Sequence, residues 1–241
     1  MAIAGLYDIF NHWHQVGTVY LYSDPHFGDK DIPNRPTDEE QLACINSKVG
    51  KKDTIIILGD CGDTSFIRRI RAQRKILVMG NHDAGKTNYQ RIIHYRKFDT
   101  NEYTEKDARQ VMEKEHPDCC ITVCEGYDNA LRSPFHFWEA WADNRLFDEV
   151  YEGPLVIGPK LILSHEPVDV SWAMNLHGHI HDSRHKNDER HFNVCAEAID
   201  FMPLNFNKWM KEGHLSHIED IHRDTIDRAT KRCRKREVKK K

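Results

Sequence analysis

The sequence contains no apolar run long enough to cross a membrane, and no basic stretch leads into an apolar one near its first residue. We therefore expect no membrane span, no membrane partner and no secretory signal peptide. The seven cysteines are odd in number and lack paired spacing, which argues against a disulfide framework and for reduced thiols in the cytoplasm. With 241 residues, of which 39% are hydrophobic, the chain is large enough for one soluble domain with a substantial core.

The chain also has little net charge, since its formal value is -3, but this charge is unevenly distributed. Residues 228–241 carry nine Lys or Arg and one Glu, which is +8, so that residues 1–227 carry -11. This basic tail has two interpretations: an arm for nucleic acid or another polyanion, or a solvated helix end that folds back on the acidic body. The tail alone does not identify a nucleic-acid-binding protein, and the sequence does not determine an oligomeric state.

Polar side chains follow five short apolar runs, which lie at 18–23, 54–58, 76–79, 160–164 and 175–176. Short, partly β-branched runs are typical of strands buried in an α/β sheet. Ligands bind at the carboxyl ends of such strands, so each polar cluster is a candidate site. The clusters contain Asp24 and His26, Asp60, Asn81 with His82 and Asp83, His165, and His179 with His181.

Imidazole and carboxylate groups are ligands that suit Mn, Fe, Zn and Ni. Seven ligands of this kind exceed the need of one ion, so we expect two metals. Asp60 leaves its strand level with Asp24, and a carboxylate is suited to bridge two ions about 3.5–4 Å apart. Asp63 has two open interpretations: it orients a catalytic histidine, or it caps a helix that we expect at 65–74.

Taken in order, these motifs resemble the calcineurin-like metallophosphoesterase superfamily, over roughly residues 18–83 and 155–205. The motifs are Asp24-x-His26, Gly59-Asp60-x-x-Asp63, Gly80-Asn81-His82-Asp83, Ser164-His165 and Gly178-His179-x-His181. The resemblance implies an α/β fold of four layers, an α/β/β/α sandwich with two central mixed sheets. Where phosphoprotein phosphatases of this superfamily have Arg-Gly, this chain has Thr64-Ser65, so that it is more similar to small prokaryotic or phage phosphoesterases.

The resemblance also implies a dinuclear centre with an assigned set of ligands. One metal would be held by Asp24, His26, Asp60 and His181, and the other by Asp60, Asn81, His165 and His179. Manganese is our default for both ions, with Fe, Zn or Ni as alternatives. Two divalent ions lower the pKa of a water between them, and the resulting hydroxide attacks phosphorus in line.

His82 stands next to a ligand without being one in the family pattern, so the resemblance gives it the role of protonating the leaving oxygen. Its alternative is a histidine that only hydrogen-bonds the phosphate. We expect a phosphodiesterase acting on a nucleotide or nucleic-acid type of substrate. The alternatives are a phosphomonoesterase and a non-catalytic interaction module on the same fold.

Between residues 84 and 145 the family pattern stops, and we interpret this stretch as an insertion in a domain that spans 1–227. Thr104 and Asp107 predict a capped helix over 104–115. His116, Cys119, Cys120 and Cys124 leave two interpretations, a structural zinc site or buried thiols in a short strand. An insertion directly after the catalytic loop is where a cap over the active site would lie.

Overall fold

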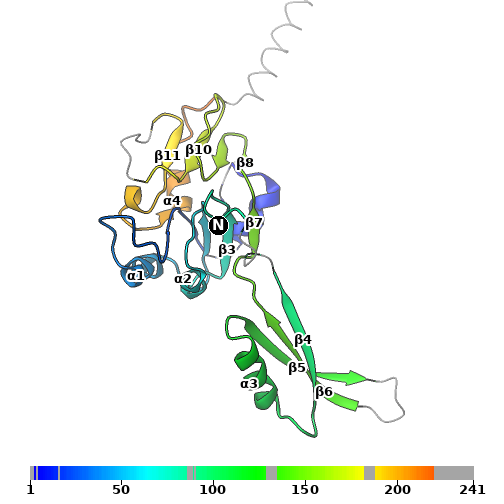
Figure 1. Cartoon of the computed structure of the whole chain (residues 1–241). Helices are drawn as coiled ribbons and strands as arrows, with labels where there is room; N and C mark the ends of the chain where they lie inside the picture. Colours follow the sequence, from blue (N-terminus) through cyan, green and yellow to red (C-terminus); the bar gives the residue numbers. More distant parts are fainter. Residues whose placement is uncertain are drawn as a thin grey trace, which may run out of the picture. The chain divides into compact units, whose positions relative to one another are not determined.

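The computed structural model describes residues 3, 5–15, 17–85, 89, 91–128, 135–181 and 188–219. The basic tail at 228–241, with both of its interpretations, lies outside these residues. The chain divides into two compact units, one formed by the residues before Gly85 and after Leu146, the other by Gly85–Leu146 (Figure 1). No helix in the described ranges is long and apolar enough to cross a bilayer.

The first unit is built on two mixed β-sheets. Four parallel strands of the five-stranded sheet are β1 (Val19–Tyr22), β2 (Thr54–Ile57), β3 (Arg74–Val78) and β7 (Glu149–Tyr151), and β12 (Leu204–Asn205) is antiparallel to β1. The four-stranded sheet has the order β11-β10-β9-β8. Its strands are β8 (Leu155–Gly158), β9 (Leu161–Leu163), β10 (Met174–His177) and β11 (His191–Asn193), and only β8 is antiparallel to its neighbour.

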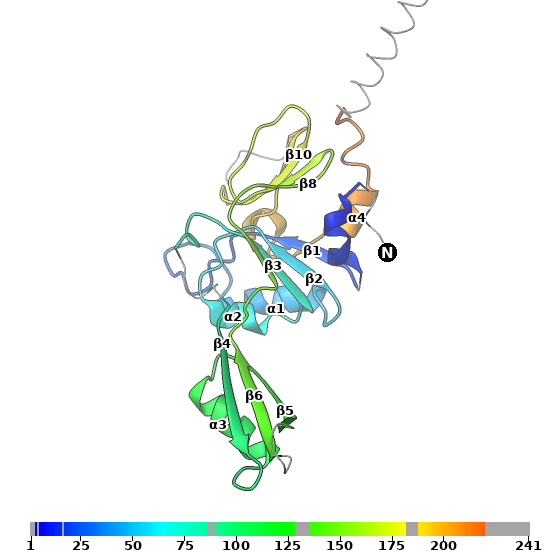
Figure 2. The same ribbon diagram turned by 90° about the vertical axis from the view of Figure 1, so that its right-hand side faces the viewer.

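The main hydrophobic core lies between the two sheets. Ile56 of β2 and Leu163 of β9 are both fully buried members of one cluster that draws on both sheets. Because side chains alternate along a strand, Ile55 and Ile57 are buried on the opposite face of the five-stranded sheet. Helices α1 (Asp38–Lys48) and α2 (Thr64–Arg69) lie on that side (Figure 2). The predicted fold class, α/β with two central mixed sheets, is confirmed.

Helices α1 and α2 begin within one residue of their predicted starts, but α2 ends early. Thr37 and Glu40 form the capping box of α1. Helix α2 ends at Arg69 rather than at residue 74, so the predicted extent was wrong, because the chain already enters β3 at Arg74. The short 3-10 helix η1 (Asp8–His14) buries Phe10 and Trp13 against the core.

Helix α4 (Phe206–Lys211) and the 3-10 helix η3 (Glu197–Ile199) follow the last strand of the four-stranded sheet. Trp209 of α4 is almost fully buried, and its ring lies 5.5 Å from that of Phe192 in β11. Because Phe206 also joins the main core, α4 closes one end of the space between the sheets.

The second unit is an antiparallel sheet with one helix and a core of its own. Its strand order is β4 (Ile93–Asp99), β6 (Phe135–Asp143), β5 (Cys120–Asp128), and α3 (Glu105–Glu115) carries the predicted capping box at Thr104. Its buried core consists of Phe98, Ala108, Met112, Val123, Ala140 and Ala142. The unit begins and ends within one residue of the expected insertion at 84–145. Whether it caps an active site stays a prediction.

The cysteines of the second unit fit neither interpretation from the sequence. Cys120 and Cys124 are exposed, so the expectation of buried thiols was wrong for them. Within the described part of the chain, groups of three metal-ligating side chains form only in the first unit. The zinc interpretation therefore has no support from the structure.

Candidate metal centre

Seven side chains predicted as ligands leave the carboxyl ends of five strands and meet above the two sheets. Six of them form two groups of three whose ligand atoms lie within 4.8 Å of one another. The first ligand group is Asp24, His26 and His181, and the second ligand group is Asp60, His165 and His179. The seventh, Asn81, joins the second group, because its Oδ1 lies 2.9 Å from His165 Nε2.

The first ligand group presents two buried atoms without a hydrogen-bond partner among the described residues. Asp24 Oδ2 accepts hydrogen bonds from the Ser23 hydroxyl, the His179 amide and the Cys195 thiol. Asp24 Oδ1 and His26 Nε2 have no such partner and lie 3.8 Å apart. Orphaned buried polar atoms are rare in folded proteins. A cation between these two atoms would satisfy both, so the group fits a metal ion.

Asp60 stands between the two groups. Its Oδ2 lies 3.5 Å from His26 Nε2 in the first group and 3.3 Å from His165 Nε2 in the second. Its Oδ1 accepts the backbone N–H of His82 at 2.9 Å, which fixes the orientation of the carboxylate. One carboxylate oxygen therefore faces the imidazoles of both groups.

Hydrogen bonds at Nδ1 orient two of the imidazoles. His165 Nδ1 lies 2.8 Å from the carbonyl oxygen of Leu58, and His181 Nδ1 lies 3.0 Å from Glu197 Oε1. Both partners only accept, so Nδ1 carries the proton in each ring. In the neutral form of each ring the Nε2 lone pair is available for a metal, which is the arrangement typical of metal-ligating histidines.

Five of the seven predicted ligands have a left-handed backbone. The φ values are 55° for Asp24, 42° for His26, 54° for Asp60, 71° for His179 and 49° for His181. Non-glycine residues rarely adopt this conformation, and each instance costs about 1–3 kcal/mol. Strained backbone of this kind concentrates at functional sites, and here it turns side chains from separate loops toward one centre.

Two close approaches of the backbone require glycine. A Cβ on Gly178 would lie 1.9 Å from the Ser23 hydroxyl oxygen and 2.3 Å from Asp24 Oδ2. A Cβ on Gly80 would lie 2.3 Å from Asp60 Oδ1. Any side chain at these two positions would displace Asp24 or Asp60, which explains glycine beside the ligands.

The carboxylates give the centre a negative field. Burial opposes the ionisation of Asp24, but His26, His165 and the donors at Oδ2 hold its pKa at about 2. Burial likewise opposes the protonation of His165, but Asp60, Asp24 and the Leu58 carbonyl raise its pKa to about 9. A field that retains protons on an imidazole also attracts metal cations.

Of the two predicted catalytic residues, His82 lies beside the first ligand group and Asp63 caps a helix. The ring of His82 lies 5.4 Å from that of His26, and its side chain is exposed. Asp63 is the N-cap of α2, where its carboxylate accepts the Ser65 amide at 2.9 Å. The capping interpretation accounts for this contact, and a role of Asp63 beside His82 stays a prediction.

Asp83 has a role that the sequence did not reveal. Its buried carboxylate accepts the backbone N–H groups of Asp60 at 2.7 Å, Cys61 at 3.1 Å and Gly80 at 3.0 Å. It thereby ties the loop after β2 to the loop after β3. The position of Asp83 directly after Asn81 and His82 indicated a functional residue. Its charge suggested a metal ligand rather than an acceptor of backbone hydrogen bonds.

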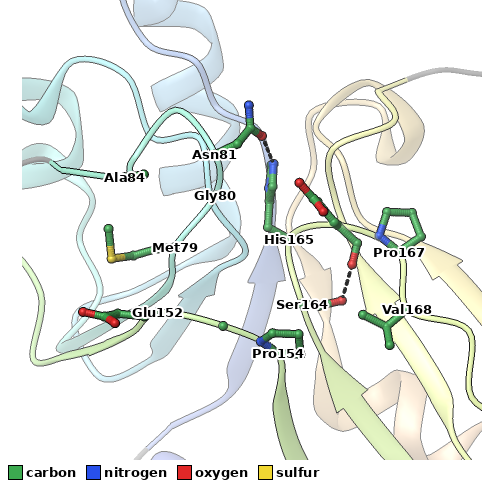
Figure 3. A pocket seen from close by; sticks show the side chains of 12 residues that line it. Met79, Gly80, Asn81, Ala84, Glu152, Pro154, Ser164, His165, Pro167 and Val168 are labelled. Carbon is green, nitrogen blue, oxygen red and sulfur yellow. Dashed lines mark hydrogen bonds between the residues drawn. The ribbon is translucent and has the colours of Figure 1, made fainter.

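A pocket of 360 Å³ opens beside the second ligand group (Figure 3). Asn81 and His165 border it, and Met79, Pro154, Pro167 and Val168 supply apolar walls. Glu152 and Glu166 also line it, whereas no Lys or Arg does so among the described lining residues.

The chain was compared with protein families, with curated proteins and with solved structures. The family model of the calcineurin-like phosphoesterases matches residues 17–193. No curated protein matches the chain. A protein of unknown function from Aquifex aeolicus has a similar structure, with a TM-score of 0.48 and 18% identity over 81% of this chain and 98% of its own. The nuclease MPE from Pseudomonas putida shows a TM-score of 0.35 and 19% identity over 68% of this chain and 61% of its own.

Proposed function

Because the chain belongs to the calcineurin-like phosphoesterase family, and is therefore a metal-dependent phosphoester hydrolase, we propose that it binds two divalent cations and hydrolyses phosphodiesters. The substrate we propose is of the nucleotide or nucleic-acid type. Manganese is the proposed metal, since the mixed imidazole, carboxylate and amide ligands suit it, with Fe, Zn and Ni as alternatives.

The position of Asp60 carries the proposal of two cations. Its Oδ2 lies within 3.5 Å of His26 Nε2 and within 3.3 Å of His165 Nε2, so one oxygen serves both ligand groups. A site for a single ion would not need a second complete group on the far side of this carboxylate. This arrangement supports a two-metal centre, in which Asp60 would serve as a ligand to both ions.

When bound, the two cations would neutralise phosphoryl oxygens and supply hydroxide at neutral pH by lowering the pKa of water between them. Asp24 and Asp60 contribute two negative charges, and the histidines and Asn81 contribute none when neutral. This balance leaves a net positive centre that draws in a phosphate monoanion. The backbone bonds to Asp60 and His165 keep these side chains in place, so little reorganisation accompanies substrate binding.

We assign the proton donor to His82. Its backbone N–H is fixed by Asp60 Oδ1 at 2.9 Å, and its exposed ring lies next to the ring of His26. A side chain so placed can reach the ester oxygen of a substrate that approaches the first ligand group from solvent. Protonation of that oxygen as the P–O bond breaks avoids release of a high-energy alkoxide.

The pocket beside the second ligand group favours a diester over a monoester. A monoester is a dianion near neutral pH, whereas a diester carries one charge and presents a neutral ester group. Glu152 and Glu166 repel additional negative charge, and the apolar walls accept a neutral group. Because the described lining residues include no Lys or Arg, the pocket offers a second phosphate charge no counterion.

A side-by-side assay tests the proposal. The metal-depleted protein is reconstituted with Mn, Fe, Ni, Zn or Mg and given bis-(p-nitrophenyl) phosphate or p-nitrophenyl phosphate. We expect faster turnover of the diester and two ions per chain at saturation. A preference for the monoester would reverse the substrate assignment, and turnover of neither ester would favour the non-catalytic alternative.

A further inference from the structure

We propose that Arg35 and Glu197 are positioning residues for the first ligand group. The proposal rests on the two-cation site of the proposed function. It states that these two side chains hold Asp24, His26 and His181 in ligating geometry, and that the second ligand group does not depend on them. Arg35 lies in the loop after β1, and Glu197 begins η3, so the pair joins segments 162 residues apart in sequence.

Arg35 holds the backbone of the loop that carries Asp24 and His26. Its Nη2 donates to the Asp24 carbonyl at 2.6 Å, and its Nη1 donates to the Pro25 carbonyl at 2.8 Å. These carbonyls belong to the turn in which Asp24 and His26 have positive φ. The planar fork of an arginine can bind both carbonyls and still reach a carboxylate, which a lysine cannot.

Glu197 connects the same arginine to the third ligand. Glu197 Oε1 accepts Arg35 Nε at 2.6 Å and His181 Nδ1 at 3.0 Å. The contact occupies Nδ1 of His181 and leaves Nε2 as the nitrogen available to a cation, and His181 forms the first ligand group with Asp24 and His26. One buried ion pair therefore contacts, directly or through the loop, every member of that group.

Burial indicates that the pair has a function beyond stability. The Arg35 side chain is only 7% exposed and that of Glu197 14%. Glu197 Oε2 is buried without a hydrogen-bond partner in the described structure, so the pair is an imperfect one. Buried ion pairs of this kind contribute little net stability compared with apolar residues of the same size. A role in orienting the ligands accounts for such a pair beside the first ligand group.

The second ligand group is held by other means. The Leu58 carbonyl orients His165, and the Asp83 carboxylate binds the backbone at Asp60 and Gly80. No described contact links Arg35 or Glu197 to these residues. Asp24 Oδ2 also accepts the His179 amide of the second group, but Arg35 binds the Asp24 carbonyl and not this carboxylate. Loss of the pair should therefore weaken the first cation site and leave the second nearly unchanged.

The test measures metal binding by calorimetry and metal content, separately from activity. For E197Q and R35K we expect affinity at one of two sites to fall about 10- to 100-fold, the effect typical of residues that orient metal ligands. The second site should keep its affinity. The matched control is Arg69, which donates to both oxygens of Glu39 at 2.7 Å on the exposed surface; R69K should change neither site.

Three further comparisons decide the outcome. The double variant R35M/E197M removes both buried charges and avoids an unpaired one, so it remains testable if a single variant unfolds. In an H181A background, E197Q should cause a smaller further loss of affinity than in the unaltered protein, because only its contact with Arg35 remains; a fully additive loss would indicate a general structural role. Two sites of unchanged affinity in folded E197Q and R35M/E197M would overturn the proposal. Fewer than two sites in the unaltered protein would instead overturn the proposed function.

Discussion

The two ligand groups differ in what holds them. The first group depends on two long side chains, since Arg35 donates to the Asp24 carbonyl and Glu197 accepts from His181. The second depends on a backbone carbonyl and on Asp83, because Leu58 orients His165 and Asp83 binds the backbone of Asp60. Backbone groups of buried strands move less than long side chains. We therefore expect the second group to keep its geometry under conditions that disturb the first.

Both groups combine buried ligands with a more exposed histidine. Asp24 is fully buried in the first group, and Asp60 and His165 are nearly so in the second, whereas His181 is half-buried and His179 exposed. Each group thus has an inner wall fixed by the sheets and an outer histidine from the loop after β10. The outer histidines are where exchange of a cation with solvent would begin.

Replacement of Asp60 by alanine should abolish metal binding in both ligand groups, and so should have the largest effect. Asp60 Oδ2 faces imidazoles of both groups, so D60A should lose binding at both sites and reduce turnover about 1,000-fold, the upper range for one electrostatic group. Metal content by mass spectrometry and turnover of a diester measure this. D63A is the control on the same loop: it should lose about 1 kcal/mol of folding stability as a helix cap and retain both metals. Two tightly bound ions in D60A would contradict the shared role.

Replacement of His82 tests whether this residue, next to the first ligand group, protonates the leaving oxygen. H82A should retain both cations, because its ring contacts His26 without belonging to either group. Turnover should fall about 100- to 10,000-fold on an ester with a poor leaving group and little on p-nitrophenyl esters. H94A, on the exposed surface of the second unit, is the control. Equal losses on good and poor leaving groups would exclude proton donation and favour the alternative that His82 only binds phosphate.

Much of this organisation could be predicted from the sequence, because strands and the turns after them are local. The Thr54–Ile57 run, the capping boxes at Thr37 and Thr104, and the polar residues after each strand all have their signal within a few positions. The order of the motifs identified the family. The helix expected at 65–74 was too long, because helical periodicity does not show where β3 begins.

The supports of the ligands could not be predicted, since they depend on contacts between distant segments. Glu197 reaches Arg35 across 162 positions, and neither residue lies in a periodic pattern. Asp83 stood inside a recognised motif, but only the fold shows that its carboxylate binds three backbone amides.

Metal binding at the second group should depend on pH through His165. The pKa of His165 is raised to about 9 in the protein without metal, so the ring is protonated at pH 7 and a cation must displace that proton. Apparent affinity should then rise about tenfold per pH unit up to about pH 9. Calorimetry in buffers of different ionisation enthalpy counts the protons released, and H165Q should remove this release. Affinity independent of pH between 6 and 8 would contradict the assignment of His165 as a ligand.

The smallest effect concerns the pocket beside the second group. Glu166 and Glu152 disfavour a dianionic phosphate there. A monoester carries one more negative charge than a diester, so the two carboxylates repel it more strongly. Removing one carboxylate charge with E166Q should raise monoester turnover relative to diester turnover about three- to tenfold, or ~0.6–1.4 kcal/mol, as expected for partly solvated charges several ångströms apart. E39Q, on the exposed surface of α1, should leave the ratio unchanged. Because the effect is electrostatic, it should shrink as salt is added; a ratio that changes equally at low and high salt would indicate an altered pocket shape and would remove the charge of Glu166 as the cause.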